Sequence, residues 1–204
     1  MLYLIIICGS MALITAVNAL LLPAPTAAEI GRIALLTLLG TISVIAWDGV
    51  LAFVIRRCPL WSKCFAPDSP AFRVSKKERN FYRRIGIQYW KDSIPELGFF
   101  TGFSKSEFTS PADPAYLERF LTESHYGVAI HLSNAIFGFC IIFLPWCARP
   151  AIAVPIGLVN MILSLLPTAV LRFNTAPLLS IYLRKQRGQS SILAGQINSD
   201  HFSP

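Results

Sequence analysis

Residues Leu2–Leu22 read LYLIIICGSMALITAVNALLL, an apolar stretch that contains no charged side chain. About 20 such residues in a helix are enough to cross the hydrocarbon core of a bilayer. A cleaved signal peptide is the alternative, since the small residues Ala24, Ala27 and Ala28 follow the stretch. A signal peptide begins with a basic segment, however, and no Lys or Arg precedes this stretch. We therefore expect the stretch to be retained as a membrane span.

Three more apolar runs have the length of a membrane span, and they cover residues 33–55, 126–146 and 151–171. Composition agrees, because 54% of the residues are hydrophobic and only 14% are charged, against roughly 25% charged residues in soluble proteins. We predict an all-α integral membrane protein with about four transmembrane helices, in which residues 1–189 form a single membrane domain. The polar residues 190–204 are expected to form a disordered tail.

Charged residues, prolines and aromatic residues are concentrated in residues 56–125, between the second and third runs. We expect this segment to be partly amphipathic, partly irregular, and to lie at the membrane surface. With four spans, every Lys and Arg except Arg32 and Arg149 lies on the side of this segment and of both termini. The positive-inside rule then places the segment and both termini of this multi-pass cell-membrane protein in the cytoplasm.

Several classes of function are disfavoured by what the sequence lacks. The net charge is +7, but base-stacking motifs and zinc knuckles are absent, so we expect membrane lipids and not nucleic acid as partners. Cys58 and Cys64 have a spacing unlike that of zinc ligands and no nearby histidine, so we expect no metal. A Walker loop and a dinucleotide fingerprint are also missing.

Aromatic and basic residues are mixed in residues 80–98, which read NFYRRIGIQYWKDSIPELG. Such a segment can anchor the chain at the headgroup level, with its rings in the interface and its cations near lipid phosphates. Alternatively, basic residues of this segment and just before it bind the phosphates of a nucleotide-bearing donor molecule. The residues concerned are Lys76, Lys77, Arg79, Arg83, Arg84 and Lys91. The sequence leaves both interpretations open.

His131 lies a few residues inside the third run, where an imidazole is costly unless it is paired or functional. Glu123 precedes it by about two helical turns and shares roughly the same helix face, provided that the helix has begun by Glu123. His131 could then act as a general base toward a hydroxyl group, with Glu123 orienting the imidazole. The alternative is a hydrogen-bonded structural histidine. His125 lies on another face and is expected at the surface.

Asp48 in the second run and Asn160 in the fourth are the other polar groups expected within the membrane. Each can simply bond to a neighbouring helix, which contributes on the order of 1 kcal/mol. An ionisable group within a span is also a functional candidate. If Asp48 is functional, we expect it to pair with Arg172 or with an arginine of residues 56–125.

Several separate blocks of the sequence agree in order and spacing with one known family. The blocks are Gly86-Ile87, Trp90-Lys91-Asp92 with Pro95 and Gly98, Glu123 with His131, Asn160, Pro167, and Arg172-Phe173-Asn174. Over roughly residues 75–180 the chain resembles the glycosyl-4,4'-diaponeurosporenoate acyltransferases, small membrane proteins of staphyloxanthin-type carotenoid biosynthesis. It departs from the family pattern at Val128, where a second acid is usual, and at Thr175, where a basic residue is usual. These departures put the substrate in question.

The resemblance implies transfer of a fatty acyl group to a sugar hydroxyl of a glycosylated carotenoid, isoprenoid or similar glycolipid. It implies catalytic roles for His131 as general base and for Glu123 as its partner. The binding residues that we expect are Arg83, Arg84, Trp90, Lys91, Asp92, Asn160, Arg172 and Asn174. The acyl donor is expected to be acyl-CoA or acyl carrier protein, with no other cofactor.

Two further functions compete with this hypothesis. In the first, the chain is a non-catalytic membrane scaffold or lipid-binding partner of lipid-synthesis enzymes, and its aromatic and basic segment only binds anionic headgroups. The second is a small transporter, which requires polar residues spread through the middle of the membrane, whereas here they gather toward one side. An acyltransferase could also associate with other enzymes of its pathway.

Overall fold

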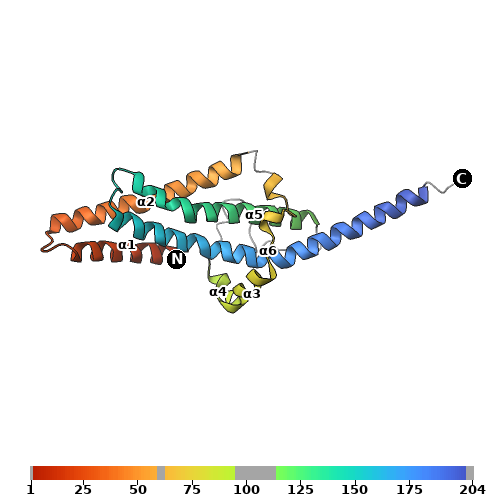
Figure 1. The fold of residues 1–204 in the computed structure, drawn as a ribbon, viewed down its shortest axis with the longest axis horizontal. Helices are drawn as coiled ribbons and strands as arrows, with labels where there is room; N and C mark the ends of the chain where they lie inside the picture. Colours follow the sequence, from red (N-terminus) through yellow and green to blue (C-terminus); the bar gives the residue numbers. More distant parts are fainter. Residues whose placement is uncertain (1, 59–62, 95–113, 201–204) are drawn as a thin grey trace.

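Four long helices form an elongated bundle in the computed structural model, which describes residues 2–58, 63–94 and 114–200 (Figure 1). All four are long and apolar enough to cross a membrane. They are α1 (Leu2–Leu20), α2 (Ala27–Arg57), α5 (Pro114–Phe137, continued to Phe143 by the 3-10 helix η6, Gly138–Phe143) and α6 (Pro150–Asp200). The prediction of an all-α membrane protein with four spans is confirmed.

Three of these helices are longer than the apolar runs that predicted them. A capping box between Thr26 and Glu29 starts α2 several residues before the run at 33–55. Helix α5 starts at Pro114, well before residue 126, and the backbone of α6 remains helical through residues 190–200, where we expected a disordered tail. Hydropathy marks the part of a helix that lies in lipid, whereas backbone hydrogen bonding continues beyond it. The end of α2, the start of α5 and the end of α6 project past α1 at one end of the bundle, which we name the polar end (Figure 1).

Helix α6 continues through three prolines, Pro155, Pro167 and Pro177. A proline has no N–H, so the carbonyl group four residues earlier loses its helical donor and needs another partner within a membrane. The Asn18 side chain donates to the Ala151 carbonyl at 3.1 Å, and the Tyr3 hydroxyl donates to the Leu163 carbonyl at 3.5 Å. Helix α1 is thus attached to α6 at the two carbonyls that Pro155 and Pro167 release.

Small residues allow α5 and η6 to pack closely on α6. A Cβ atom at Gly127 would meet Leu171 Cδ1 at 2.8 Å, and one at Gly138 would collide with the Asn160 amide nitrogen. Close backbone approach at glycine is a common way to pack helices in a membrane, where apolar burial alone drives little association. The lack of a side chain at Gly127 and Gly138 is therefore required for the observed packing of α5 and η6 on α6.

We expect Gly138→Ala to destabilise the bundle by about 1–3 kcal/mol, because the added methyl group must displace the buried Asn160 side chain. Gly49→Ala in α2 is the matched control, since a Cβ atom there meets nothing within 4 Å. The measurement is the midpoint of thermal unfolding of both variants in the same detergent. Equal midpoints would show that the α5–α6 contact tolerates the extra volume.

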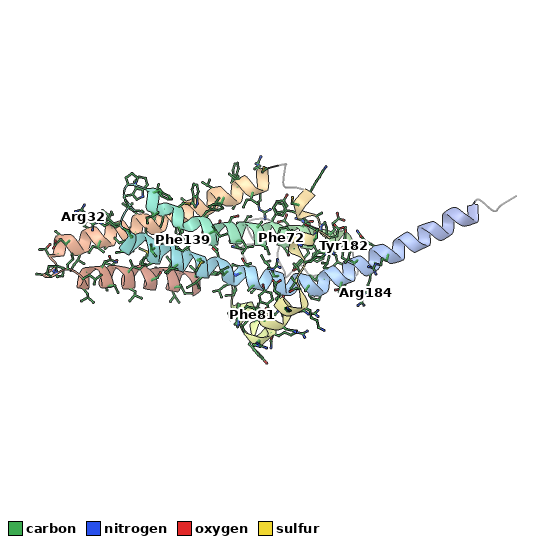
Figure 2. All side chains as sticks on the ribbon, viewed as in Figure 1. Arg32, Phe72, Phe81, Phe139, Tyr182 and Arg184 are labelled. Carbon is green, nitrogen blue, oxygen red and sulfur yellow. The ribbon has the colours of Figure 1, made fainter. Side chains whose placement is uncertain are left out.

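Short helices come between α2 and α5 in the chain, and of these α3 and α4 lie beside α6 (Figure 1). They are η2 (Pro70–Phe72), α3 (Lys76–Arg84), α4 (Ile87–Trp90) and η3 (Lys91–Ser93). Gly86 adopts a left-handed conformation with φ 68° and turns the chain from α3 into α4. Tyr82 and Ile87 are buried against Val170 of α6. Phe81, by contrast, is exposed on α3 outside the bundle (Figure 2).

Candidate active site

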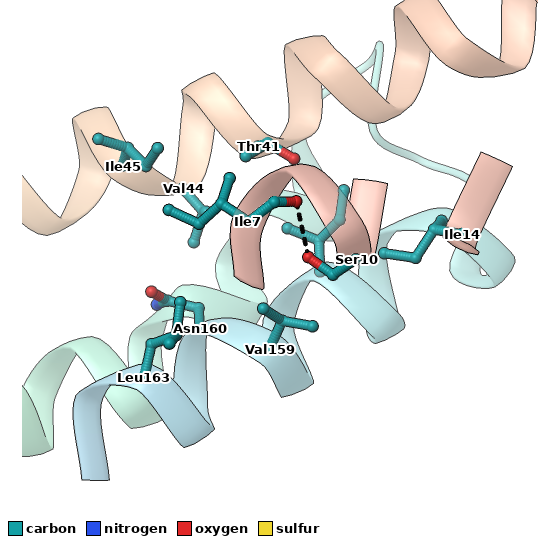
Figure 3. A pocket seen from close by; sticks show the side chains of 10 residues that line it. Ile7, Ser10, Ile14, Thr41, Val44, Ile45, Val159, Asn160 and Leu163 are labelled. Carbon is teal, nitrogen blue, oxygen red and sulfur yellow. Dashed lines mark hydrogen bonds between the residues drawn. The ribbon is translucent and has the colours of Figure 1, made fainter. Parts of the chain in front are cut away.

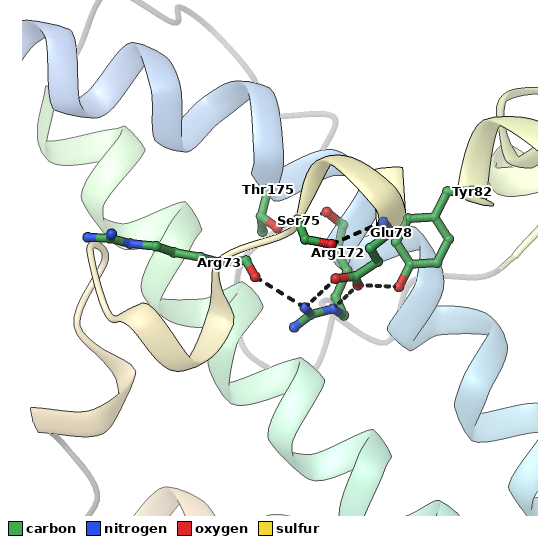
Figure 4. A network of polar contacts seen from close by, with 6 residues as sticks. All are labelled: Arg73, Ser75, Glu78, Tyr82, Arg172 and Thr175. Atoms are coloured by element: carbon green, nitrogen blue, oxygen red, sulfur yellow. Dashed lines mark hydrogen bonds and ion pairs between the residues drawn. The ribbon is translucent and has the colours of Figure 1, made fainter. Parts of the chain in front are cut away.

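A polar network attaches α3 to α6 at the polar end (Figure 4). The Arg172 guanidinium donates two hydrogen bonds to the Glu78 carboxylate, of which the one from Nη2 to Oε2 measures 2.9 Å. The Tyr82 hydroxyl donates to the same carboxylate at 2.7 Å, and the Ser75 hydroxyl accepts from the Glu78 backbone N–H. Two-point contact between arginine and carboxylate fixes orientation as well as distance, so the network sets the position of α3 on the bundle.

Arg172 was predicted as a binding residue, whereas Glu78 and Tyr82 were not recognised from the sequence. The local signals were a helix cap at Ser75 and the i,i+4 spacing of Glu78 and Tyr82 on one helix face. Neither signal points to Arg172, because the partner comes from another helix far along the chain. Sequence reasoning could place the arginine near the polar end but could not name its carboxylate.

The network also sets the protonation of its members. The Arg172 guanidinium is the main cause that lowers the pKa of Glu78 below its ordinary value of 4.5. Burial, with the hydrogen bond to Glu78, raises the pKa of Tyr82 to about 12. Around neutral pH, Glu78 is therefore ionised and Tyr82 is protonated, which is the combination that the hydrogen bonds require.

A pH dependence follows from the lowered pKa of Glu78. The pair stabilises the fold fully above the unfolded pKa near 4.5, and that contribution is lost as the pH falls through the lower folded-state pKa. We expect the unfolding temperature of the unaltered protein to drop more between pH 6 and about pH 3 than that of Glu78→Gln. Parallel pH profiles for the two proteins would contradict this assignment.

A cavity of about 390 Å³ opens between α3, α5 and α6 at the same end. It is lined by Arg79, Arg83, Phe120, Phe173, Asn174, Pro177 and Leu178. Arg83 and Asn174, predicted separately as binding residues, thus meet in one pocket. Arg79 was predicted among the cations that could bind phosphate. Phe120 was not recognised from the sequence, because it lies in the part of α5 that precedes the apolar run at residues 126–146. We name this cavity the basic pocket.

Trp90, Lys91 and Asp92 lie on α4 and η3 and do not line the basic pocket. The Trp90 indole donates to the Ile85 carbonyl at 3.2 Å, and the Lys91 ammonium pairs with the neighbouring Asp92 at 3.2 Å. Arg84 is exposed on α3, also outside the pocket lining. The structure therefore separates these four expected binding residues from Arg83 and Asn174.

Glu123 and His131 both lie on α5. The helix starts before Glu123, which was the condition for the two residues to share a helix face. The direct contact that we expected is nevertheless wrong. Eight residues of helix put the two positions about 12 Å apart along the axis, and the Glu123 carboxylate instead accepts a hydrogen bond from Arg56 of α2 at 2.9 Å. Glu123 thus joins α5 to the end of α2. His131 is half-buried one turn away from the buried Asn134.

The expectation of a surface position for His125 is also wrong, because its side chain is only 2% exposed. Its Nδ1 lies 3.1 Å from the Ala66 carbonyl oxygen, and its ring stacks on Phe72 at 4.4 Å between centroids. Residues 65–72, which follow α2, pack against the middle of α5 and cover this face of the helix. His125 therefore has a structural role in the packing of α5.

Asp48 and Asn160 contact each other inside the bundle. The Asn160 amide donates to Asp48 Oδ1 at 3.3 Å and to the Asn134 carbonyl at 3.2 Å, so that it joins α2, α5 and α6. The expected pairing of Asp48 with Arg172 or a loop arginine is wrong, because Arg172 lies three turns further along α6 and binds Glu78. Asn134 Oδ1 is buried without a hydrogen-bond partner in the described part of the chain.

Next to this cluster, Asn160 lines a small pocket of about 40 Å³ between α1, α2 and α6 (Figure 3). Ser10 of α1 and Thr41 of α2 also line it, and the remaining lining is aliphatic. The Ser10 hydroxyl donates to the Ile7 carbonyl of its own helix. The basic pocket is thus the larger of these two cavities.

Comparison with known proteins shows the family of the chain. The family model described as glycosyl-4,4'-diaponeurosporenoate acyltransferase matches residues 63–182, which include α3, α4, all of α5 and the part of α6 that lines the basic pocket. No curated protein and no solved structure matches the chain. Since the match covers more than half of the sequence, the chain belongs to the glycosyl-4,4'-diaponeurosporenoate acyltransferase family.

Proposed function

We propose that this protein transfers a fatty acyl group to a sugar hydroxyl of a glycosylated carotenoid or similar glycolipid. The observation that supports this most is where the family match falls. Residues 63–182 contain His131, the Glu78–Arg172 network and every residue of the basic pocket. The part of the chain outside the match contributes α1 and α2, whose surfaces are mainly apolar.

In the proposed reaction, the oxygen of a sugar hydroxyl attacks the carbonyl carbon of an acyl thioester. A carbon–oxygen bond forms, the carbon–sulfur bond breaks, and the hydroxyl proton ends on the departing sulfur, giving an ester and a free thiol. His131 takes the proton from the hydroxyl as general base and returns it to the sulfur. Its half-buried position leaves part of the imidazole accessible to a hydroxyl that arrives along the bilayer.

Glu123 takes a different role in this proposal from the one that the sequence suggested. Its pairing with Arg56 joins α2 to α5 about two helical turns from His131, so that Glu123 acts as a positioning residue. Asn160 likewise holds three helices together beside Asn134, one turn from His131. A rigid support of this kind keeps the base in a fixed geometry, and correct placement of reacting groups can account for several kcal/mol of a reaction barrier.

The location is suited to the chemistry. An isoprenoid tail and an acyl chain both partition into the bilayer, whereas the sugar hydroxyl and the thioester stay at the headgroup level. When both reactants are held at one end of a membrane bundle, they meet by diffusion within the plane of the membrane and not by diffusion through bulk water. The exposed Phe81, Ile85 and Tyr89 of the α3–α4 segment support its contact with the interface.

The test is mass spectrometry of lipids extracted from cells that make a glycosylated carotenoid, with and without this protein. We expect a new species whose mass exceeds that of the glycolipid by one fatty acyl group. If the lipids are identical in both cells while the protein is present in the membrane, the non-catalytic scaffold becomes the better hypothesis. In that case the α3–α4 segment serves only to bind anionic headgroups.

A further inference from the structure

The basic pocket contains two cations to which the described residues offer no counterion. Arg79 and Arg83 stand at i and i+4 on α3, so they lie on one face of the helix, and both line the cavity. Two like charges at this spacing repel each other. In the described part of the chain, neither arginine forms an ion pair, whereas the nearby Glu78 is occupied by Arg172. The pair therefore suits an anion that both guanidinium groups can contact at once.

The remaining walls of the pocket suit an elongated, weakly polar chain attached to that anion. Phe120, Phe173, Pro177 and Leu178 contribute apolar surface, and Asn174 offers one amide that can both donate and accept. The volume of about 390 Å³ falls within the usual range for small-molecule sites. A bare phosphate ion would leave most of this volume and its apolar walls unused.

The position of the pocket along α6 leaves it open to a ligand that arrives from water. Among the described residues of α6, large apolar side chains are exposed no further along the helix than Leu165. The pocket residues Phe173 and Leu178 lie about 12 and 20 Å beyond Leu165 along the helix axis. With the exposed side chains of α3 and α4 in the interface, the pocket lies at the headgroup level, where a water-soluble molecule can reach it.

We propose that the basic pocket binds the phosphopantetheine part of the acyl thioester, an inference that rests on the proposed acyl transfer. Arg79 and Arg83 hold the phosphate, Asn174 meets an amide of the pantetheine chain, and the rings of Phe120 and Phe173 flank that chain. Phe120 and His131 lie about 16 Å apart along α5, a distance suited to the long pantetheine arm. Coenzyme A and acyl carrier protein carry the same phosphopantetheine group, so either can be its source.

The experiment measures binding to the full-length protein in lipid nanodiscs, without any acceptor lipid. The probes are a nonhydrolysable acyl-CoA analogue, the same acyl chain on acyl carrier protein through the same linkage, and an acyl-pantetheine that lacks the phosphate. We expect the double variant Arg79→Gln/Arg83→Gln to weaken binding of the phosphate-bearing probe about tenfold or more. Binding of acyl-pantetheine, already weaker, should change little. Arg184→Ala, an exposed arginine of α6 outside the pocket, is the matched control.

The outcomes distinguish coenzyme A from acyl carrier protein as the source of the phosphopantetheine. They also distinguish a failure of this inference from a failure of the proposed acyl transfer. Loss of acyl-CoA binding in the double variant identifies coenzyme A as the source, and loss of binding only to the carrier protein identifies that protein. The inference is overturned if the double variant binds both donors as tightly as the unaltered protein, or if neither donor binds at all. Because no acceptor is present, a failure here leaves the lipid analysis of acyl transfer untouched. An unchanged unfolding temperature of the double variant confirms that the pocket is still folded.

Discussion

Replacing His131 by alanine should lower the rate of acyl transfer by about 100-fold or more while the protein accumulates at its normal level. The expected size follows from the usual contribution of a general base, roughly 10²–10⁴-fold. His131 is half-buried and forms no hydrogen bond within the described residues, so its removal breaks no polar contact that the fold uses. The measurement is the initial rate of glycolipid acylation in isolated membranes, normalised to the amount of protein.

Two comparisons distinguish a catalytic imidazole from a structural one. Leu132→Ala changes the exposed neighbour of His131 and should retain nearly the full rate. Added imidazole should partly restore activity to His131→Ala, because a small base can enter the space that the side chain leaves. His125→Ala should instead reduce protein abundance, since that side chain is buried against Phe72. A His131→Ala variant with more than a third of the normal rate would rule out His131 as the base.

Replacing Arg172 by alanine should detach α3 from the bundle. The Glu78 carboxylate loses both hydrogen bonds from the guanidinium and is left half-buried beside Tyr82. Hydrogen bonds to charged groups contribute about 1.5–3 kcal/mol, and an unpaired buried charge adds to the loss. We expect a loss of roughly 2–3 kcal/mol in the stability of α3 docking. Limited trypsin digestion should then cut faster after Arg79 and Arg83.

Arg187→Ala is the control for this change, because Arg187 is an exposed arginine of the same helix. Glu78→Gln should show a similar increase in cleavage, and combining it with Arg172→Ala should add less than the sum of the two single effects. Fully additive effects would mean that the two residues stabilise the protein independently. Equal digestion of Arg172→Ala and the unaltered chain would show that apolar contacts alone hold α3 in place.

The number and place of the membrane helices could be predicted because each apolar run records burial in lipid directly. Their ends could not, since residues such as Thr26 and Pro114 start helices through local backbone chemistry outside the apolar run. The same limit explains the error at His125. Its burial depends on residues 65–72 folding back over α5, a tertiary contact that leaves no periodic signal.

The sequence predicted some of the residues that line the candidate site, but it did not predict which charged residues form ion pairs with one another. Arg83 and Asn174 were expected to bind a ligand and do line one pocket. Charged partners, by contrast, come from different helices: Glu78 meets Arg172, and Arg56 meets Glu123. A sequence shows which residues are costly to bury alone, but it does not show which of several opposite charges will neutralise them. Helix packing makes that choice.

The attachment of α1 to α6 through released backbone carbonyls bears on how the family can diverge. A carbonyl acceptor is supplied by the main chain, so α6 keeps it whatever side chains surround it, provided that Pro155 and Pro167 remain. The first helix then needs only a donor at the right height, such as Asn18 or Tyr3, and its other positions can vary among apolar residues. Apolar substitutions in α1 that keep Asn18 and Tyr3 should therefore leave its attachment to α6 intact.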